Sequence, residues 1–393
     1  MAAPTPITTL PRELSATDEQ LIAASNCFGL SLFREVEGTS RDTLPNLFLS
    51  PLSVTMALGM LCTGAAGETE AAMRRTLKLE GLALEEVNRS YRGLIQMLRG
   101  LDPGVHFSLG NSIWCRQGIN FTPSFLEASR TDFDAQVETL DFTDPSAAGR
   151  INDWVRRATE GRIAEIVSPP LPSLAWMYIL NAIYFKGDWT APFDPARTHS
   201  APFRRADGST TPVSMMVPGE PIGVRLSDDG NPLVVDLPYG GRAFSMTILL
   251  PREPGGISTL VAGLTAERWN AWMGALRSDL CQVRLPKFKL ESELILNDAL
   301  RALGMGIAFE PGQADFGHMR RERDVHVTEV RHKSYVDVNE EGTEAAAATS
   351  VMLFGSTKSV RRVVVDRPFV FAIRDTLSGT ILFIGRVLDA AAA

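Results

Sequence analysis

Residues 340–363 read EEGTEAAAATSVMLFGSTKSVRRV, and this stretch gives two conflicting indications of secondary structure. Four consecutive alanines favour a helix over Thr343–Thr349, because alanine has the highest helix propensity. Val351–Phe354 instead favours a strand, and the Gly-Ser-Thr-Lys-Ser run after it favours a turn. Taken alone, the stretch would be an exposed alanine-rich linker or a short helix, so the rest of the chain has to decide its role.

Read as a strand, this stretch has one face without charge. Side chains alternate between the two faces of a strand. One face carries Thr343, Ala345, Ala347, Thr349, Val351 and Leu353, and the other carries Glu344, Ala346, Ala348, Ser350, Met352 and Phe354. The first face is small and largely apolar, so it could enter a packed sheet without a large side chain blocking the way.

Outward from this stretch, the first third of the chain has helical spacing and the last part has strand-like runs. Apolar residues recur at three- and four-residue intervals through Leu21, Ala24, Phe28 and Leu32, and again through Val54, Leu58 and Leu61. Ser53 is the candidate N-cap of the second helix. From about residue 220, short apolar runs predict strands over Leu233–Leu237, Phe244–Leu250, Val283–Leu285, Phe369–Ile373 and Ile381–Ile384.

The connections between these elements contain no linker that would divide the chain. Asp375–Gly379 is predicted to be a hairpin turn, and Arg277–Leu280 is predicted to separate a helix around Trp269 and Trp272 from a strand at Cys281. Neither an internal repeat nor a Pro/Ser-rich segment interrupts the 393 residues. Helices followed by strands without a linker predict one α+β domain.

The composition is that of a globular protein with a sizeable core. Hydrophobic residues make up 45% of the chain and charged residues 22%, which excludes a disordered, collagen-like or coiled-coil chain. The net charge of −7 would repel a polyanion, so we expect a protein partner or a neutral one and no nucleic acid. No apolar run approaches the ~18 residues of a membrane helix, and MAAPTPITTLPREL lacks the pattern of a secretion signal.

The chemistry-bearing residues point away from an enzyme. Cys27, Cys62, Cys115 and Cys281 lie far apart, which favours buried thiols over a disulfide framework or a zinc site. The motifs G-x-S-x-G, H-E-x-x-H, G-x-x-x-x-G-K-[ST] and G-x-G-x-x-G do not occur. A metal site on His326 and His332 lacks neighbouring ligands, and a discontinuous Ser-His-Asp triad remains only a formal alternative. We therefore expect no metal and no cofactor.

Four further stretches, in order along the chain, carry a family resemblance together with the alanine-rich segment. These are NLFLSPLSVTMALGMLCTGAAGETEAAM (46–73), INDWVRRATEGRIAEIV (151–167), LNAIYFKGDWTAPF (180–193) and DRPFVF (366–371). With Glu341, Gly342, Thr343 and Glu344 followed by alanines, they resemble the serpin family from about Leu21 to Asp389. Each block alone is weakly specific, whereas their joint occurrence in this order is highly specific.

The resemblance implies the serpin fold and its inhibitory mechanism. The expected fold has N-terminal helices, a large central mixed β-sheet, further sheets and an exposed reactive-centre loop at about 341–362. Residues 1–20 would be an N-terminal extension to a single domain formed by 21–393. In the family a serine protease, or in a second target class a cysteine protease, cleaves the loop, which then inserts into the central sheet as a new strand and distorts the tethered protease.

The resemblance also assigns roles to particular residues. The hinge of the loop would be Glu341, Gly342, Thr343, Ala345, Ala346, Ala347 and Ala348. Ser50, Ser53, Asn181 and His332 match a polar cluster called the shutter, where the central strands separate, and His332 could alternatively be a core histidine without a switching role. Trp189, with Glu341, matches the entry point called the breach.

The cleaved bond is expected near Ser356. Counting from the hinge glycine by the family spacing places it between Ser356 and Thr357, whereas counting back from Pro368 places it between Thr357 and Lys358. Phe354 and Lys358 remain alternative recognition residues. Because a shallow specificity pocket accepts serine without burying a charge, elastase-like or subtilisin-like serine proteases are the expected targets.

Alternatives to this interpretation remain at this point. A non-inhibitory serpin acting as a carrier, chaperone or storage protein would be expected to have bulky or charged hinge residues, unlike Thr343 and the alanines. Arg74, Arg75 and Lys78 are interpreted as a solvated helix face and not as a glycosaminoglycan site. We expect a soluble monomer, extracellular by family association or cytoplasmic as the chain is written.

Overall fold

The computed structural model describes residues 4–40, 44–172, 175–343 and 360–392. The helices are α1 (Ala16–Ser40), α2 (Pro51–Gly64), α3 (Gly67–Thr76), α4 (Leu84–Arg99), α5 (Pro123–Phe133), α6 (Ala147–Ala158), α7 (Ile257–Ala262), α8 (Ala266–Ala275) and α9 (Asn297–Leu300). Short helical turns lie at Pro195–Arg197, Pro254–Gly256, Arg301–Met305 and Gly306–Phe309.

The strands fall into two sheets. They are β1 (Asn46–Leu49), β2 (Val105–Arg116), β3 (Ala135–Leu140), β4 (Met177–Asp188), β5 (His199–Arg204), β6 (Thr210–Met216), β7 (Ile222–Ser227), β8 (Leu233–Tyr239), β9 (Phe244–Leu250), β10 (Arg277–Pro286), β11 (Phe288–Ile295), β12 (Arg331–Val338), β13 (Gly342–Thr343), β14 (Arg361–Val364), β15 (Phe369–Asp375) and β16 (Ile381–Val387). Helices and sheets together confirm the α+β class.

In the described part of the chain, the larger sheet has ten strands in the order β1-β16-β15-β9-β8-β7-β10-β6-β5, and β14 pairs in parallel with β10. β9, β15 and β16 are buried along their whole length. This burial explains why their sequences are continuous apolar runs and not alternating ones. The predicted strands from residue 233 onward are confirmed, and Asp375–Gly379 forms the turn between β15 and β16.

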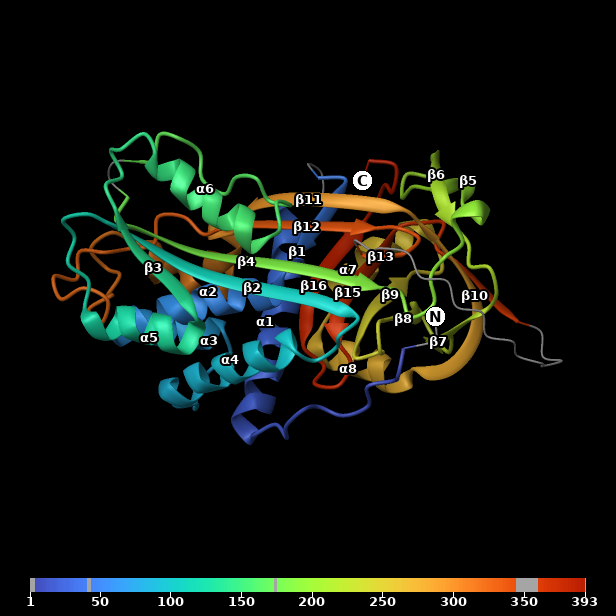
Figure 1. Cartoon of the computed structure of the whole chain (residues 1–393), viewed down its shortest axis with the longest axis horizontal. Helices are drawn as coiled ribbons and strands as arrows, with labels where there is room; N and C mark the ends of the chain where they lie inside the picture. The colour runs from blue at the N-terminus through green and yellow to red at the C-terminus, as the bar shows by residue number, and fades with distance from the viewer. Residues whose placement is uncertain (1–3, 41–43, 173–174, 344–359, 393) are drawn as a thin grey trace.

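The smaller sheet is mixed and has the order β11-β12-β13-β4-β2-β3 in the described residues. All of its neighbouring strands are antiparallel except β2 and β3, which are parallel. Since β12 and β4 both run antiparallel to β13, they run parallel to each other. Figure 1 shows α6 and α2 on opposite faces of this sheet, so its central strands are covered on both sides.

Helix α6 covers the sheet through a small core of its own. Trp154 packs edge-on against Trp114 of β2, with ring centroids 6.4 Å apart. A Cβ atom placed on Gly110 of β2 would lie 3.3 Å from the Cβ of Ala158, so the helix sits close to the strand. The other buried members include Leu140, Ile151, Val155, Ile163 and Leu180.

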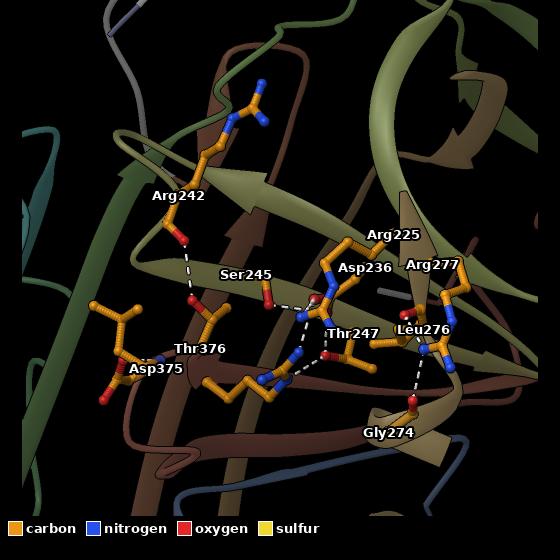
Figure 2. A network of polar contacts seen from close by, with 12 residues as sticks. Arg225, Asp236, Arg242, Ser245, Thr247, Gly274, Leu276, Arg277, Asp375 and Thr376 are labelled. Atoms are coloured by element: carbon orange, nitrogen blue, oxygen red, sulfur yellow. Dashed lines mark hydrogen bonds and ion pairs between the residues drawn. The ribbon is translucent and has the colours of Figure 1, made fainter. Parts of the chain in front are cut away.

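The larger sheet contains a buried ion pair (Figure 2). The hydroxyls of Ser245 and Thr247 donate to the Asp236 carboxylate at 2.9 and 2.5 Å. Arg374 of β15 pairs with the same carboxylate at 2.7 Å, and both side chains are buried. A buried carboxylate requires hydrogen bonds and a counter-charge, and these contacts supply both while joining β8, β9 and β15.

Four details differ from the sequence predictions. Strands β1 and β2 lie within the first third of the chain, which was predicted to be helical. The N-cap of α2 is Ser50 and not Ser53, because the Ser50 hydroxyl accepts the Ser53 amide at 3.1 Å and Pro51 occupies the first turn. Arg277–Leu280 belongs to β10 and is not a separate connection. Of the four free cysteines, Cys27 is only partly buried, whereas the other three are buried.

The N-terminal residues lie against the body of the protein. Helix α1 begins at Ala16, within the stretch expected to be an extension. Residues 4–15 precede it, and the Ile7 amide donates to the Gly241 carbonyl at 2.7 Å. The boundary of the domain at residue 21 remains a prediction.

Candidate strand-insertion site

Strand β13 is the first part of the alanine-rich segment and already lies in the smaller sheet. Gly342 is in register with Asp188 of β4, and Thr343 is in register with Gly187 of β4 and with Val338 of β12. In the hydrogen-bonded order, β12 and β4 are joined through β13. At Thr343 the chain is therefore a strand and not the helix that alanine propensity alone favoured, and residues 344–349 lie outside the described residues.

A turn at Asn339 brings the chain back from β12 into β13. The Asn339 side-chain oxygen accepts hydrogen bonds from the backbone amides of Glu341 and Gly342 at 3.1 and 3.3 Å. The backbone amide of Asn339 donates to the Gly342 carbonyl at 2.9 Å. Asparagine is suited to such turns because its short side chain can bond the backbone two residues on. This turn fixes where the new strand starts.

Gly342 lies at a position where a side chain cannot be accommodated. A Cβ atom there would lie 2.1 Å from the Gly187 carbonyl oxygen and 2.8 Å from the Asp188 Cα. Both contacts are with backbone, which cannot swing aside as a flexible side chain could. Close approach of the backbone of β4 therefore accounts for a glycine at position 342.

Thr343 points into the protein from β13. Its side chain is buried, and its hydroxyl and that of Tyr239 lie 2.8 Å apart in a hydrogen bond. Burial raises the pKa of Tyr239, so the phenol keeps its proton. The Tyr239 ring stacks on Trp189 with centroids 4.4 Å apart and an interplanar angle of 11°.

Trp189 holds both sides of the turn at this entry point. Its backbone amide donates to the Glu341 carbonyl at 2.9 Å, and its indole Nε1 donates to the Asn339 carbonyl at 2.9 Å. Phe193 packs against the same indole edge-on at 6.0 Å. The two residues matched to the breach, Trp189 and Glu341, are therefore in direct contact.

The four residues matched to the shutter also come together, between α2 and the smaller sheet. The Ser50 amide donates to His332 Nε2 at 3.0 Å, and the Ser50 hydroxyl donates to the Leu382 carbonyl at 2.6 Å. The Ser53 hydroxyl donates to the Asn181 side-chain oxygen. Because these groups are buried, each lost partner would leave an unsatisfied polar atom.

Asn111 extends this cluster and was not found from the sequence. Asn111 of β2 is in register with Asn181 of β4, and the Asn181 amide donates to the Asn111 side-chain oxygen at 2.5 Å. The side-chain amide of Asn111 donates to the Phe133 carbonyl at the end of α5, at 2.6 Å. A hydrogen-bonded chain therefore runs from α2 through β4 and β2 to α5.

The His332 ring is neutral at physiological pH. Burial lowers its pKa from 6.5 to about 4. A neutral ring fits its contact, since Nε2 accepts a hydrogen from the Ser50 amide. This histidine was also half of the weak metal-site alternative. Among the described residues, no group of three or more potential ligands could hold a metal ion.

Several sequence-predicted residues lie outside the described ranges. They are the hinge alanines Ala345, Ala346, Ala347 and Ala348 and the candidate recognition residues Phe354, Ser356, Thr357 and Lys358. Tyr239, Asn339 and Asn111 are the residues of the site that the sequence did not indicate. Their only signal was a polar or aromatic residue inside an otherwise apolar strand or beside the hinge.

Two of the three cations considered for a glycosaminoglycan site have acidic partners on the protein. Arg74 pairs with Glu70 at 3.1 Å and Arg75 pairs with Glu68 at 2.5 Å. These contacts favour a solvated helix face, as the sequence indicated. In the described residues, no helix is both long enough and apolar enough to span a membrane.

Comparisons with known proteins agree with this architecture. The family model for serpins, serine protease inhibitors, matches residues 23–390. The human leukocyte elastase inhibitor is 34% identical over 378 residues, covering 94% of this chain and 99% of the relative. Human serpin B8 is 35% identical over 376 residues, with the same shares. The chain therefore belongs to the serpin family of serine protease inhibitors.

Solved structures give the same result. A thermophilic serpin, tengpin, in its native state matches with a TM-score of 0.85 and 28% identity, covering 99% of this chain and 97% of that one. Human thyroxine-binding globulin in complex with thyroxine matches with a TM-score of 0.85 and 26% identity, covering 95% and 100%. These matches confirm the expected serpin fold.

Proposed function

We propose that this protein is an irreversible suicide-substrate inhibitor of serine endopeptidases and not itself an enzyme. A target protease would cleave the segment that follows Thr343, and the freed strand would then insert into the smaller sheet before the acyl-enzyme hydrolyses. The observation that carries this proposal is the position of β13 between β12 and β4. The first residues of the segment already occupy the path that insertion would follow.

The energetics favour continued insertion from this start. A strand that extends β13 would be antiparallel to both neighbours, which is the more stable pairing for each ladder. If roughly a dozen residues join at about 1 kcal/mol net per hydrogen bond, insertion stabilises the product by on the order of 10 kcal/mol. Loop insertion in serpins is an established example of such strand addition.

The two polar sites would have different roles in this process. Trp189, Tyr239 and Asn339 would hold the entry point, the proposed breach, so that insertion always begins at Gly342. Ser50, Ser53, Asn181 and His332 would form the shutter between α2 and the strands that must separate. Hydroxyl, amide and imidazole groups could exchange partners as β4 moves away from β12, whereas apolar groups could not.

Elastase-like or subtilisin-like serine proteases are the proposed targets, with cysteine proteases as a second class. Relatives named as leukocyte elastase inhibitors from human and cattle, 34% and 36% identical, support a target with a shallow specificity pocket. The small residues around Ser356 agree with such a pocket. The protein is proposed to act as a monomer.

Two measurements test this proposal. Incubation with a panel of proteases should give a higher-mass complex that resists SDS. Mass spectrometry of the released C-terminal peptide identifies the bond: a start at Thr357 supports Ser356, a start at Gly355 transfers recognition to Phe354, and a start at Ser359 transfers it to Lys358. If every protease of the panel stays fully active on its own substrate and no SDS-resistant complex forms, the inhibitory function would be contradicted.

The rival function is that of a non-inhibitory carrier, chaperone or storage protein. Thyroxine-binding globulin, one of the structural relatives, is described in complex with a small hormone. The small hinge residue Thr343 and the preformed β13 favour the inhibitor, because a carrier does not require a strand that enters the sheet. A carrier would be cleaved without gaining thermal stability.

A further inference from the structure

Strands β10 and β14 form a two-stranded surface where the chain returns to the body after residue 359. The pairing is parallel, with Gln282 in register with Arg362 and Arg284 in register with Val364. Cys281, Val283 and Leu285 of β10 are buried, together with Val363 of β14. Because side chains alternate along a strand, Gln282, Arg284 and Arg362 lie on the opposite, outward face.

Arginines on this surface differ in how their charge is balanced. Arg361 pairs with Asp228 at 3.0 Å and with Asp279 at 3.4 Å. Arg284 and Arg362, within the described ranges, have no ion pair, and the Arg284 Nε is buried without a hydrogen-bond partner. Two neighbouring guanidinium groups thus lie on this face without a carboxylate, that of Arg362 exposed and that of Arg284 partly buried.

Arg284 and Arg362 place two unbalanced positive charges on one face of a protein whose net charge is −7. Two like charges on one face of a strand pair repel each other and destabilise the sheet slightly. Guanidinium groups prefer bidentate contact with carboxylates, and Arg361 shows that acidic partners are available close by. A carboxylate of a partner protein would therefore supply the counter-charge that Arg284 and Arg362 lack.

The position of the pair places it under a bound protease. Arg362 follows the proposed bond at Ser356–Thr357 by a stretch that reaches at most about 20 Å when fully extended. A protease of about 220 residues has a radius of gyration of about 17 Å and so is more than 40 Å across. A protease engaged on this bond is therefore large enough to reach β14 and β10, which lie at the same end of the molecule as β13 (Figure 1).

We propose that Arg284 and Arg362 form a docking point for an acidic patch on the target protease, beside the subsites that bind residues after the cleaved bond. The pair would then determine which protease is inhibited fastest, in addition to the residues of the loop. This inference rests on the proposed inhibitory function. Since charge complementarity at a rim acts mainly on the association rate, the pair affects encounter and not the insertion that follows.

The test compares second-order rate constants of inhibition for the wild type, Arg362→Ala, the Arg284→Ala/Arg362→Ala double variant and Arg362→Glu. Two serine proteases of equal primary specificity are used. One has an acidic patch and the other a basic patch on the surface that would face Arg284 and Arg362. Measurements are made at 50, 150 and 500 mM NaCl. Arg321→Ala is the matched control, because Arg321 is exposed and lies beside the start of α5, far from β10 in Figure 1.

For the acidic protease at 50 mM salt, the single alanine variant should be about three- to fivefold slower and the double variant about tenfold slower. Arg362→Glu should be slower still, and all differences should shrink at 500 mM. The basic protease and the Arg321→Ala control should show no loss. Stoichiometry and the yield of SDS-stable complex should stay at wild-type values, which separates docking from a damaged fold.

Equal rates for all variants, equal losses with both proteases, or losses that do not depend on salt would overturn the docking point. Acceleration of the wild type by heparin that disappears in the double variant would assign the pair to a polyanion and would also overturn it. If the wild type forms no complex with either protease, the inhibitory function fails instead. Cleavage of the loop requires the same encounter between the two proteins. The cleavage rates of the wild type and the variants would then still test whether Arg284 and Arg362 form a docking point.

Discussion

Replacing Thr343 with arginine tests the insertion mechanism most directly. Thr343 is 1% exposed and its hydroxyl bonds to Tyr239 in the structure. A guanidinium group at this position would be buried beneath the sheet without a carboxylate, which costs about 3–5 kcal/mol. Loss of the hydroxyl hydrogen bond adds about 1 kcal/mol. The sum is smaller than the order of 10 kcal/mol expected for insertion, so the final state remains accessible while the path to it is impeded.

The expected result is a change from inhibitor to substrate. Because Thr343 already lies in β13, an arginine there would leave the sheet in the uncleaved protein, and insertion would have to bury it again. If about 4 kcal/mol of this cost appears in the barrier to insertion, insertion slows by a factor of about 10³. Hydrolysis of the acyl-enzyme would then be faster than insertion of the strand. The variant should be cleaved to completion, with little SDS-stable complex and active protease left over, and its cleaved form should lack most of the gain in melting temperature that cleaved wild type shows.

The matched control is Thr343→Ser, which keeps the hydroxyl and the small volume. It should trap protease with nearly wild-type stoichiometry. The assay is a titration of residual protease activity against inhibitor, with the complex followed on SDS gels. Should Thr343→Arg trap protease with unchanged stoichiometry, strand insertion through β13 would be refuted.

Three further predictions concern the hinge, the shutter and the larger sheet. Gly342→Ala should displace β13 and reduce trapping of the protease, because the new Cβ would lie 2.1 Å from the Gly187 carbonyl oxygen. Hydrogen exchange at the Gly187 backbone amide should become faster, and an unchanged exchange rate would contradict the close approach. His332 should lower the stability of the protein in acid. Burial depresses its pKa from 6.5 to about 4, so the unfolded chain takes up a proton at a higher pH than the folded protein does. The contribution of His332 to stability is therefore intact above pH 6.5 and is lost as the pH falls toward 4, by up to about 3 kcal/mol. Denaturant midpoints across this range should fall less for His332→Gln than for the wild type, and parallel curves would be the contrary result. Asp236→Ala should destabilise the protein by about 3–5 kcal/mol, measured as a shift in the same midpoint, because the buried Arg374 would lose its counter-charge; a shift below 1 kcal/mol would be inconsistent with that pair.

The strands of the larger sheet were predictable from the sequence because burial leaves a local signal. β9, β15 and β16 are buried at every position, so each is a continuous apolar run between turn residues. β2 gave no such signal, because Asn111 and Ser112 are polar although both are buried. Their burial depends on partners in other strands and helices, which a local pattern does not contain.

The candidate site was predictable only in part for the same reason. The residues matched to the shutter and to the breach were chosen from family resemblance, and within each set the structure places the residues in contact. Asn111 entered the site only through its register with Asn181, seventy positions away in the chain. Ser50 and not Ser53 became the cap of α2, since the choice between two nearby serines depends on the backbone geometry before Pro51.

The pairing of β14 with the larger sheet determines what holds the molecule together once its chain is broken. Thr343 is bound to the smaller sheet, whereas Arg361 continues into β15 and β16, which lie in the interior of the larger sheet with neighbours on both sides. A break between Thr343 and Val360 would thus produce two polypeptides interleaved in one particle. The shorter one would migrate separately only after denaturation, so a native gel and an SDS gel of the same sample would disagree about whether the protein is intact.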